Sequence, residues 1–233
     1  MKIEVCVNRI EDVIALQNFA VDRIELCIEL GCGGLTPSTA MVERALEISA
    51  IPLHILVRPR SGHFVYSTEE CQLMESDCLH FQRMGVAGLV VGALDTNREL
   101  PLAFLSRLRQ QLPDLCLVFH RAFDEIAVPY SALDHLKNIG YDGVLTSGSS
   151  PRAAENISEL AAWQSHTKER PFILPGGGIN PQNCLSFAAA GFEWIHLSAK
   201  QQVLPPFDSP FNSPHYGLDL SVLSEVMALV HAP

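Results

Sequence analysis

Eight short apolar segments alternate with eight amphipathic segments along the chain, and this alternation is what most constrains the fold. The apolar segments have the length and composition of β-strands, and they span residues 2–7, 23–28, 53–60, 88–94, 115–120, 143–146, 172–174 and 194–198. The amphipathic segments carry helix-start and helix-stop signals, and they predict helices at residues 10–17, 36–49, 67–84, 100–112, 129–139, 150–165, 180–190 and 218–230. Strict alternation predicts parallel strands joined by helical crossovers.

Eight such units in 233 residues match the size of a (β/α)8 TIM barrel, an α/β fold of one domain. The alternative is an open, doubly wound sheet, which usually has a glycine-rich turn after its first strand. Val7-Asn8-Arg9 stand at that point and contain no glycine, so the barrel is favoured and no nucleotide cofactor is indicated. We assign residues 1–200 to the barrel core. Residues 201–233, a proline-rich segment and a closing helix, complete the same domain.

The composition argues against several classes of protein. The net charge is −10 and no run of Lys or Arg occurs, which disfavours a nucleic-acid surface or an anionic-membrane surface. The longest near-apolar run, residues 86–94, contains glycines and is too short to cross a bilayer. The seven cysteines are scattered, and a strand begins directly after Met1 without a signal peptide. We therefore expect free thiols and a cytoplasmic location.

The side chains of a barrel strand point alternately to the surrounding helices and to the barrel axis. Placing the more apolar face against the helices leaves polar residues on the axis, mostly toward the carboxyl ends of the strands, where barrel active sites form. This inward set comprises Glu4, Cys6, Asn8, Arg23, Glu25, Cys27, His54, Arg58, Arg60, Cys116, His120, His196 and Ser198. The set predicts a functional pocket; the alternative is an ion-pair network that only packs the interior.

Two arginines end the third strand, and each needs a partner because a guanidinium group stays charged when it is buried. We expect Arg58 to be the deeper one and to pair with Glu25, with Glu4 as an alternative partner. Arg60 is expected nearer the rim, beside His63. Together they would form a clamp for an anionic ligand.

Two loops that contain glycine add to this anion-binding hypothesis. Glycines let main-chain N–H groups approach an anion closely, and the late loops of a barrel often bind phosphate. With the arginines, the groups that would bind a phosphate or a carboxylate are Ser147, Gly148, Gly176, Gly177, Gly178, His196 and Ser198. The alternative is that the glycines only permit tight turns.

The segment from His120 to Asp124 is a candidate acid–base element. His120 ends the fifth strand, and Asp124 could orient it as a general base. Glu25 is a second candidate acid–base group. The alternative is a strand-end histidine whose hydrogen bonds are satisfied within the fold.

Cys6 and Cys27 occupy comparable inward positions on the first two strands. Two soft thiolates could hold Cu(I). However, free cysteine also packs in cores as a small apolar residue, and the chain contains no CxxC pair. Cys32, in a glycine-rich loop, is the thiol that we expect to be most exposed.

Several motifs in this order resemble the CutC family of copper homeostasis proteins. They are Glu4-Val5-Cys6-Val7, Arg23-Ile24-Glu25-Leu26-Cys27, Gly33-Gly34-Leu35-Thr36-Pro37, Arg58-Pro59-Arg60, His120-Arg121-Ala122-Phe123-Asp124, Thr146-Ser147-Gly148 and Pro175-Gly176-Gly177-Gly178. The resemblance implies a cytoplasmic TIM barrel that forms a homo-oligomer, with a dimer favoured, and it implies copper as a ligand of Cys6 and Cys27. His63 departs from the family pattern, which has an acidic residue there.

Two hypotheses for function remain open after the sequence. The first is copper binding through Cys6 and Cys27, as the resemblance implies. The second is a barrel enzyme that acts on a small phosphorylated or carboxylated metabolite, because the Arg, Glu, His and glycine motifs suit an anionic organic ligand.

Overall fold

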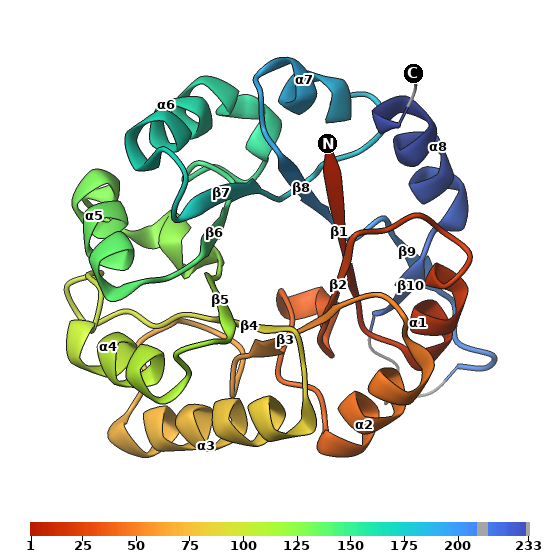
Figure 1. Cartoon of the computed structure of the whole chain (residues 1–233). Helices are drawn as coiled ribbons and strands as arrows, with labels where there is room; N and C mark the ends of the chain where they lie inside the picture. The colour runs from red at the N-terminus through yellow and green to blue at the C-terminus, as the bar shows by residue number, and fades with distance from the viewer. Residues whose placement is uncertain (209–213, 232–233) are drawn as a thin grey trace.

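The computed structural model describes residues 1–208 and 214–231, and within them eight parallel strands form a barrel (Figure 1). The strands are β1 (Lys2–Val7), β2 (Arg23–Leu26), β3 (Leu53–Val57), β4 (Gly88–Val91), β5 (Cys116–Phe119), β6 (Gly143–Thr146), β7 (Phe172–Pro175) and β8 (Trp194–Leu197). Each strand from β1 to β7 pairs with its sequence neighbour, and β8 returns to pair with β1. A bridge between Gly176 and His196 closes the ring between β7 and β8. The predicted (β/α)8 barrel is confirmed.

The helices surround the strands as an outer ring (Figure 1). They are α1 (Ile10–Leu16), α2 (Thr39–Ile48), α3 (Thr68–Met84), α4 (Leu102–Gln111), α5 (Pro129–Ile139), α6 (Ile157–Thr167), α7 (Cys184–Ala189) and α8 (Leu220–Val230). Short 3-10 helices follow three strands: η1 (Leu30–Cys32), η2 (Arg121–Glu125) and η3 (Ala153–Glu155). They lie in the connections after β2, β5 and β6, so they shape the carboxyl-terminal end of the barrel.

The starts of the helices agree with the sequence prediction for α3 and differ from it for α2. Ser67 and Glu70 form the predicted capping box of α3, and Gly85 ends that helix in the left-handed conformation. Helix α1 begins at Ile10 as predicted, although Arg9 before it makes no side-chain cap. The predicted start at Thr36 is wrong, because the cap of α2 is Ser38, whose side chain accepts the N–H of Met41.

The alternation of inward and outward side chains is confirmed by two separate apolar clusters. One lies between strands and helices and includes residues predicted to face outward, such as Val5, Ile55 and Phe119. The other fills the barrel interior and comprises Cys6, Cys27, Leu30, Leu56, Val90, Val118, Leu145 and Leu174. The interior cluster lies next to the charged residues of β1 and β2, so apolar side chains surround these charges inside the barrel.

Glycines at inward positions make room for large neighbours across the strands. A Cβ on Gly88 would lie 2.5 Å from the ring of His54, and a Cβ on Gly143 would lie 2.5 Å from the ring of Phe172. Gly92 leaves the same space for His120. In the barrel interior, each of these glycines leaves a space that the ring of a neighbouring residue fills. This close packing fixes the orientation of the rings.

The proline-rich segment after β8 contains regular structure that the sequence did not predict. Lys200–Val203 (β9) and His215–Leu218 (β10) form an antiparallel hairpin, while residues 209–213 lie outside the described part. Asp219 then caps α8, which closes the ring as predicted. Among the described residues, no helix has both the length and the apolar character needed to span a membrane.

Candidate functional site

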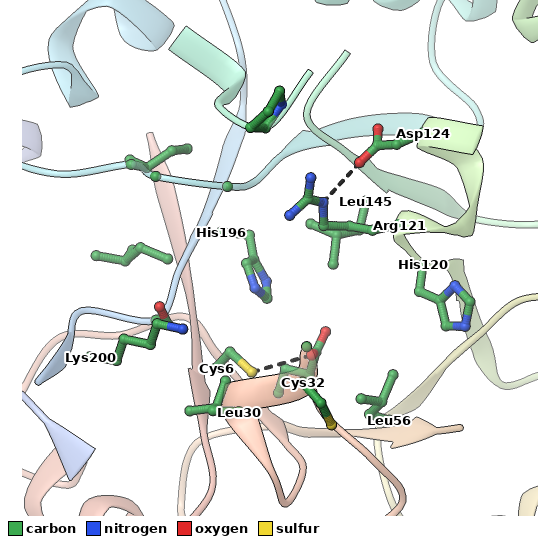
Figure 2. A pocket seen from close by; sticks show the side chains of 18 of the residues that line it. Cys6, Leu30, Cys32, Leu56, His120, Arg121, Asp124, Leu145, His196 and Lys200 are labelled. Atoms are coloured by element: carbon green, nitrogen blue, oxygen red, sulfur yellow. Dashed lines mark hydrogen bonds and ion pairs between the residues drawn. The ribbon is translucent and has the colours of Figure 1, made fainter. Parts of the chain in front are cut away.

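A cavity of about 650 Å³ opens at the carboxyl-terminal end of the barrel, where the sequence places the functional pocket (Figure 2). Its polar lining includes Cys6, Glu25, His120, Arg121, His196 and Lys200. Apolar side chains separate these groups, among them Leu30, Leu56, Phe64, Leu145 and Ile179. Mixed apolar walls with a few convergent polar groups are typical of a small-molecule site.

The floor of the cavity carries a cluster of soft and hard donor atoms. The Sγ atoms of Cys6 and Cys27 lie 3.6 Å apart, and the Cys6 thiol also donates to Glu25 Oε1 at 3.3 Å. One ligand atom each from Cys6, Glu25 and His196 lies within 4.8 Å of the other two. Cys27 lies beside this trio and is fully buried. These residues come from β1, β2 and β8, which are neighbours in the barrel.

Glu4 holds this floor from beneath. Its Oε2 accepts from Arg23 Nε at 2.5 Å and its Oε1 pairs with His196 Nδ1 at 2.7 Å. Burial alone would raise the pKa of Glu4, but the Arg23 guanidinium and His196 hold it at about 2. Glu4 is therefore a fixed anion. Since it engages Nδ1 of His196, it orients the imidazole and leaves Nε2 for the cavity.

The three donors of the floor are shifted by burial and by one another. Burial, followed by the nearby Glu4 carboxylate, raises the pKa of Glu25. The neighbouring Cys27 and burial raise the pKa of Cys6 well above its usual range. Burial would lower the pKa of His196, but the Cys6 sulfur and the two carboxylates raise it well above its usual value. The resting floor thus combines a thiol with an imidazolium.

His120 is a neutral imidazole with a fixed tautomer. Its Nδ1 accepts the main-chain N–H of Ala122 at 3.1 Å, so the proton is on Nε2. Burial and the Arg58 charge lower the pKa of His120 to about 3. Nε2 is buried and has no hydrogen-bond partner among the described residues. The expected orientation by Asp124 is wrong, because Ala122 takes that place.

Asp124 instead fixes an arginine. Its Oδ1 accepts from Thr146 Oγ1 at 2.5 Å and from the N–H of Ser147 at 3.0 Å, and its Oδ2 accepts from Arg121 Nε at 2.8 Å. Arg121 also donates to Ser147 Oγ at 2.7 Å. Figure 2 shows the Arg121 guanidinium reaching into the cavity near Leu145. Asp124 and Ser147 therefore position Arg121.

The predicted pairing of Arg58 with Glu25 is wrong. The Arg58 guanidinium lines the cavity but donates to the carbonyls of Cys32, Gly34 and Gly62, so it ties together the loops after β2 and β3. Glu25 is left with Cys6, and its Oε2 has no partner among the described residues. Arg23, which is adjacent in register to Glu4, makes the buried ion pair instead.

Arg60 lies near His63, as predicted, but it does not line the cavity. Its Nε donates to Glu70 at 2.5 Å, and its remaining N–H groups reach the carbonyls of Ser61, His63 and Val65. The expected anion clamp of two arginines is therefore not formed, because main-chain carbonyls and Glu70 already occupy the donors.

The other predicted anion-binding residues divide into two groups. Gly177, Gly178, His196 and Ser198 line the cavity. Ser147, Gly148 and Gly176 lie behind it: Ser147 supports Arg121, and a Cβ on Gly176 would meet Leu145 and His196. Sequence reasoning missed Arg121, Asn180 and Lys200 as lining residues. All three come after the end of a barrel strand, where the alternation of strand faces no longer predicts which way a side chain points.

Comparisons with known proteins agree with this architecture. The model of the CutC family matches residues 1–201. The chain belongs to the CutC family. Relatives described as CutC family proteins include one from Histophilus somni, 37% identical over 86% of this chain and 83% of the relative, and one from Proteus mirabilis, 33% identical over 99% and 90%.

Solved structures give the same result. One described as a candidate copper homeostasis protein CutC from Streptococcus agalactiae superimposes with a TM-score of 0.80 at 30% identity, over 85% of this chain and 98% of that one. A structure described as the aldolase QR15 superimposes with a TM-score of 0.63 at 15% identity, over 85% and 90%. The second likeness shows only the shared barrel fold.

Proposed function

We propose that this CutC-family protein binds Cu(I) on the floor of its barrel, through Cys6 and Cys27 with His196 as a third ligand. The observation that carries the proposal is the distance of 3.6 Å between the two sulfur atoms, beside an imidazole that Glu4 orients. Thiolate sulfur and imidazole nitrogen are ligands that suit copper, and Cu(I) in particular prefers sulfur. Glu25, a harder oxygen donor, is better suited to take up the proton of Cys6.

The geometry of the sulfur pair fits a metal without rebuilding the barrel. Two sulfurs bonded to one ion at about 2.3 Å are roughly 3.8 Å apart in tetrahedral geometry and roughly 4.0 Å apart in the trigonal geometry of three ligands. The observed separation needs a shift of only about 0.2–0.4 Å to reach those values. Because the pKa of Cys6 is raised, the metal must displace a proton. Binding should therefore release protons and weaken as the pH falls.

The same proposal includes a cytoplasmic location and a homodimer. All seven cysteines are unpaired, which suits a reducing compartment. The family resemblance supports assembly of identical chains. Size-exclusion chromatography with light scattering distinguishes a dimer from the 25.6 kDa monomer.

The test is an anaerobic Cu(I) titration against a chromogenic competitor. We expect about one Cu(I) per chain in the wild type and none held against the competitor after Cys6→Ser with Cys27→Ser. The matched control is Cys71→Ser with Cys184→Ser, which removes two thiols of the outer helices α3 and α7 and should leave binding unchanged. Equal Cu(I) binding by the wild type and the Cys6/Cys27 variant would refute the proposal.

A second candidate function is a barrel enzyme that acts on a small phosphorylated or carboxylated molecule. It is favoured by the cavity itself, whose volume of about 650 Å³ far exceeds what a metal ion needs. Buried polar groups without partners are rare, and Glu25 Oε2 and His120 Nε2 are two of them beside this cavity. In this function Glu25 would transfer protons and the neutral His120 would donate a hydrogen bond to a substrate oxygen.

This candidate is tested on metal-free protein with a panel of small anionic metabolites and ligand-observed NMR. We expect at least one metabolite to bind and to be converted, and Glu25→Gln to retain binding but to lose conversion. Lys2→Gln, a surface change at the other end of β1, is the control. If no member of the panel binds, this candidate loses its support while the copper proposal stands.

A further inference from the structure

The loop after β7 presents main-chain donors that nothing in the described structure uses. Gly177 and Gly178 have φ values of +110° and +72°, which a side chain would strain, and both line the cavity together with Ile179. The N–H groups of Gly178 and Ile179 have no hydrogen-bond partner within the described residues. Ile179 is buried, so its free N–H group is the more notable of the two.

The carbonyl groups of the same two peptides are engaged, and this sets the direction of the N–H groups. The carbonyl of Gly177 accepts the N–H of Ala153 at 3.0 Å, and that of Gly178 accepts Nδ2 of Asn183 at 2.9 Å and of Asn180 at 3.2 Å. In a trans peptide the N–H points opposite to the carbonyl. The free N–H groups therefore point away from Ala153 and from the two asparagines.

Arg121 adds a charged donor at the same place. Asp124 and Ser147 hold its Nε and Nη2, whereas Nη1 makes no hydrogen bond within the described residues. A Cβ added to Gly177 would lie 3.4 Å from this Nη1. The missing side chain of Gly177 thus keeps open the space between the loop and the guanidinium, which Figure 2 shows extending into the cavity.

We infer that this corner of the cavity binds the phosphate group of a small phosphate monoester. The N–H groups of Gly178 and Ile179 would donate to phosphate oxygens from the loop, and Nη1 of Arg121 would donate from the facing wall. A phosphate offers oxygens in several directions, which suits donors from two walls better than a planar carboxylate does. Asp124 offsets part of the charge of Arg121. Lys200 also lines the cavity, but its Nζ lies 4.6 Å from the centre of the Tyr216 ring and is not part of this corner.

The remainder of the ligand would extend toward the floor. Glu25 Oε2 and His120 Nε2 are without partners there, and both residues line the cavity. Hydroxyl or carbonyl oxygens on the ligand would satisfy these atoms. The inference deepens the second candidate function and is independent of Cu(I) binding, because it uses none of the sulfur atoms.

The experiment is a titration of metal-free, 15N-labelled protein with inorganic phosphate and with glycerol phosphate, followed by amide NMR. We expect saturable shifts at Gly178 and Ile179 with both probes, and tighter binding of the monoester. Arg121→Ala should weaken binding roughly tenfold or more, since a hydrogen bond between charged partners is lost. Arg121→Lys should restore part of it. Arg83→Ala removes an exposed arginine of α3 and should change nothing.

Three outcomes would overturn the inference. The first is that the amides of Gly178 and Ile179 do not move in the wild type, a result that does not depend on any variant folding. The second is equal binding by wild type and Arg121→Ala when their thermal unfolding is the same. The third is acetate binding as tightly as phosphate, which would assign a carboxylate. Cu(I) titration of Arg121→Ala, expected to be unchanged, separates failure here from failure of the copper proposal.

Discussion

The buried ion pair between Arg23 and Glu4 should dominate the stability of the barrel floor. Glu4 is fully buried and Arg23 nearly so, and the guanidinium also lies 4.3 Å from the centre of the Trp194 ring. Removing one partner of a buried pair costs about 3–5 kcal/mol, because the charge that remains loses its counter-ion. Without Arg23, His196 alone would face the Glu4 carboxylate. We therefore expect Arg23→Met to lower the free energy of unfolding by about that amount at pH 7.

The pKa of Glu4 gives a second route to the same magnitude. Its folded value of about 2 against an ordinary value of 4.5 corresponds to roughly 3 kcal/mol of stability. A lowered pKa contributes stability above the unfolded pKa, and that contribution is lost as the pH falls from about 4.5 toward 2. In Arg23→Met the pKa of Glu4 should rise, so the variant should lose less stability than the wild type on going from pH 7 to pH 3.

Urea denaturation at pH 7 and pH 3 measures both effects. Arg23→Met combined with Glu4→Gln should recover much of the loss, because the carboxylate that Arg23 neutralises is gone and His196, whose pKa Glu4 helps to raise, can lose its proton. The control is Arg44→Met, in an exposed pair with Glu47, which should change stability by less than about 0.5 kcal/mol. A loss below about 1 kcal/mol in Arg23→Met, or a pH dependence equal to that of the wild type, would refute the reasoning.

Two further predictions concern the loops and the interior. Arg58→Ala should lose roughly 2–3 kcal/mol by freeing three loop carbonyls, and Arg60→Ala, which is more exposed, about 1 kcal/mol. Denaturation curves compare the two, and equal losses would contradict the assignment of Arg58 as the deeper brace. Gly88→Ala should cost about 1–3 kcal/mol because its Cβ would meet the ring of His54. Adding His54→Ala should relieve that clash, and persistence of the full loss in the double variant would show that the ring is not its cause.

Much of the fold could be predicted because its signals are local. Helix α5 and strand β6 have the predicted bounds, since a proline at the helix start, a glycine at its end and a run of apolar residues leave little freedom. Helix α7 is shorter than predicted at both ends: it begins at Cys184 and ends at Ala189. Residues 180–181, which were predicted to begin this helix, form a turn instead, in which the side chain of Asn183 accepts the N–H of Asn180.

The candidate site was predictable only as far as the strands extend. Glu4, Cys6 and Glu25 are in the interior, as alternation requires, because each lies within a strand of defined direction. Arg121 lies in the 3-10 helix after β5, and its direction depends on Asp124 and on Ser147, which arrives from β6. No pattern within one segment contains that information, so the arginine that reaches the cavity was missed.

The choice of ion pair is the step that most changes the chemistry of the site. Charge alone allows either Arg23 or Arg58 to neutralise the buried carboxylates, but the register places Arg23 opposite Glu4, while Arg58 lies beyond the end of β3 and serves the loops. With Arg23 committed to Glu4, Glu25 has no cation of its own apart from His196. The free carboxyl oxygen of Glu25 therefore needs a partner from outside the fold. In the copper proposal this partner is the proton displaced from Cys6, and in the enzyme proposal it is a group of the substrate.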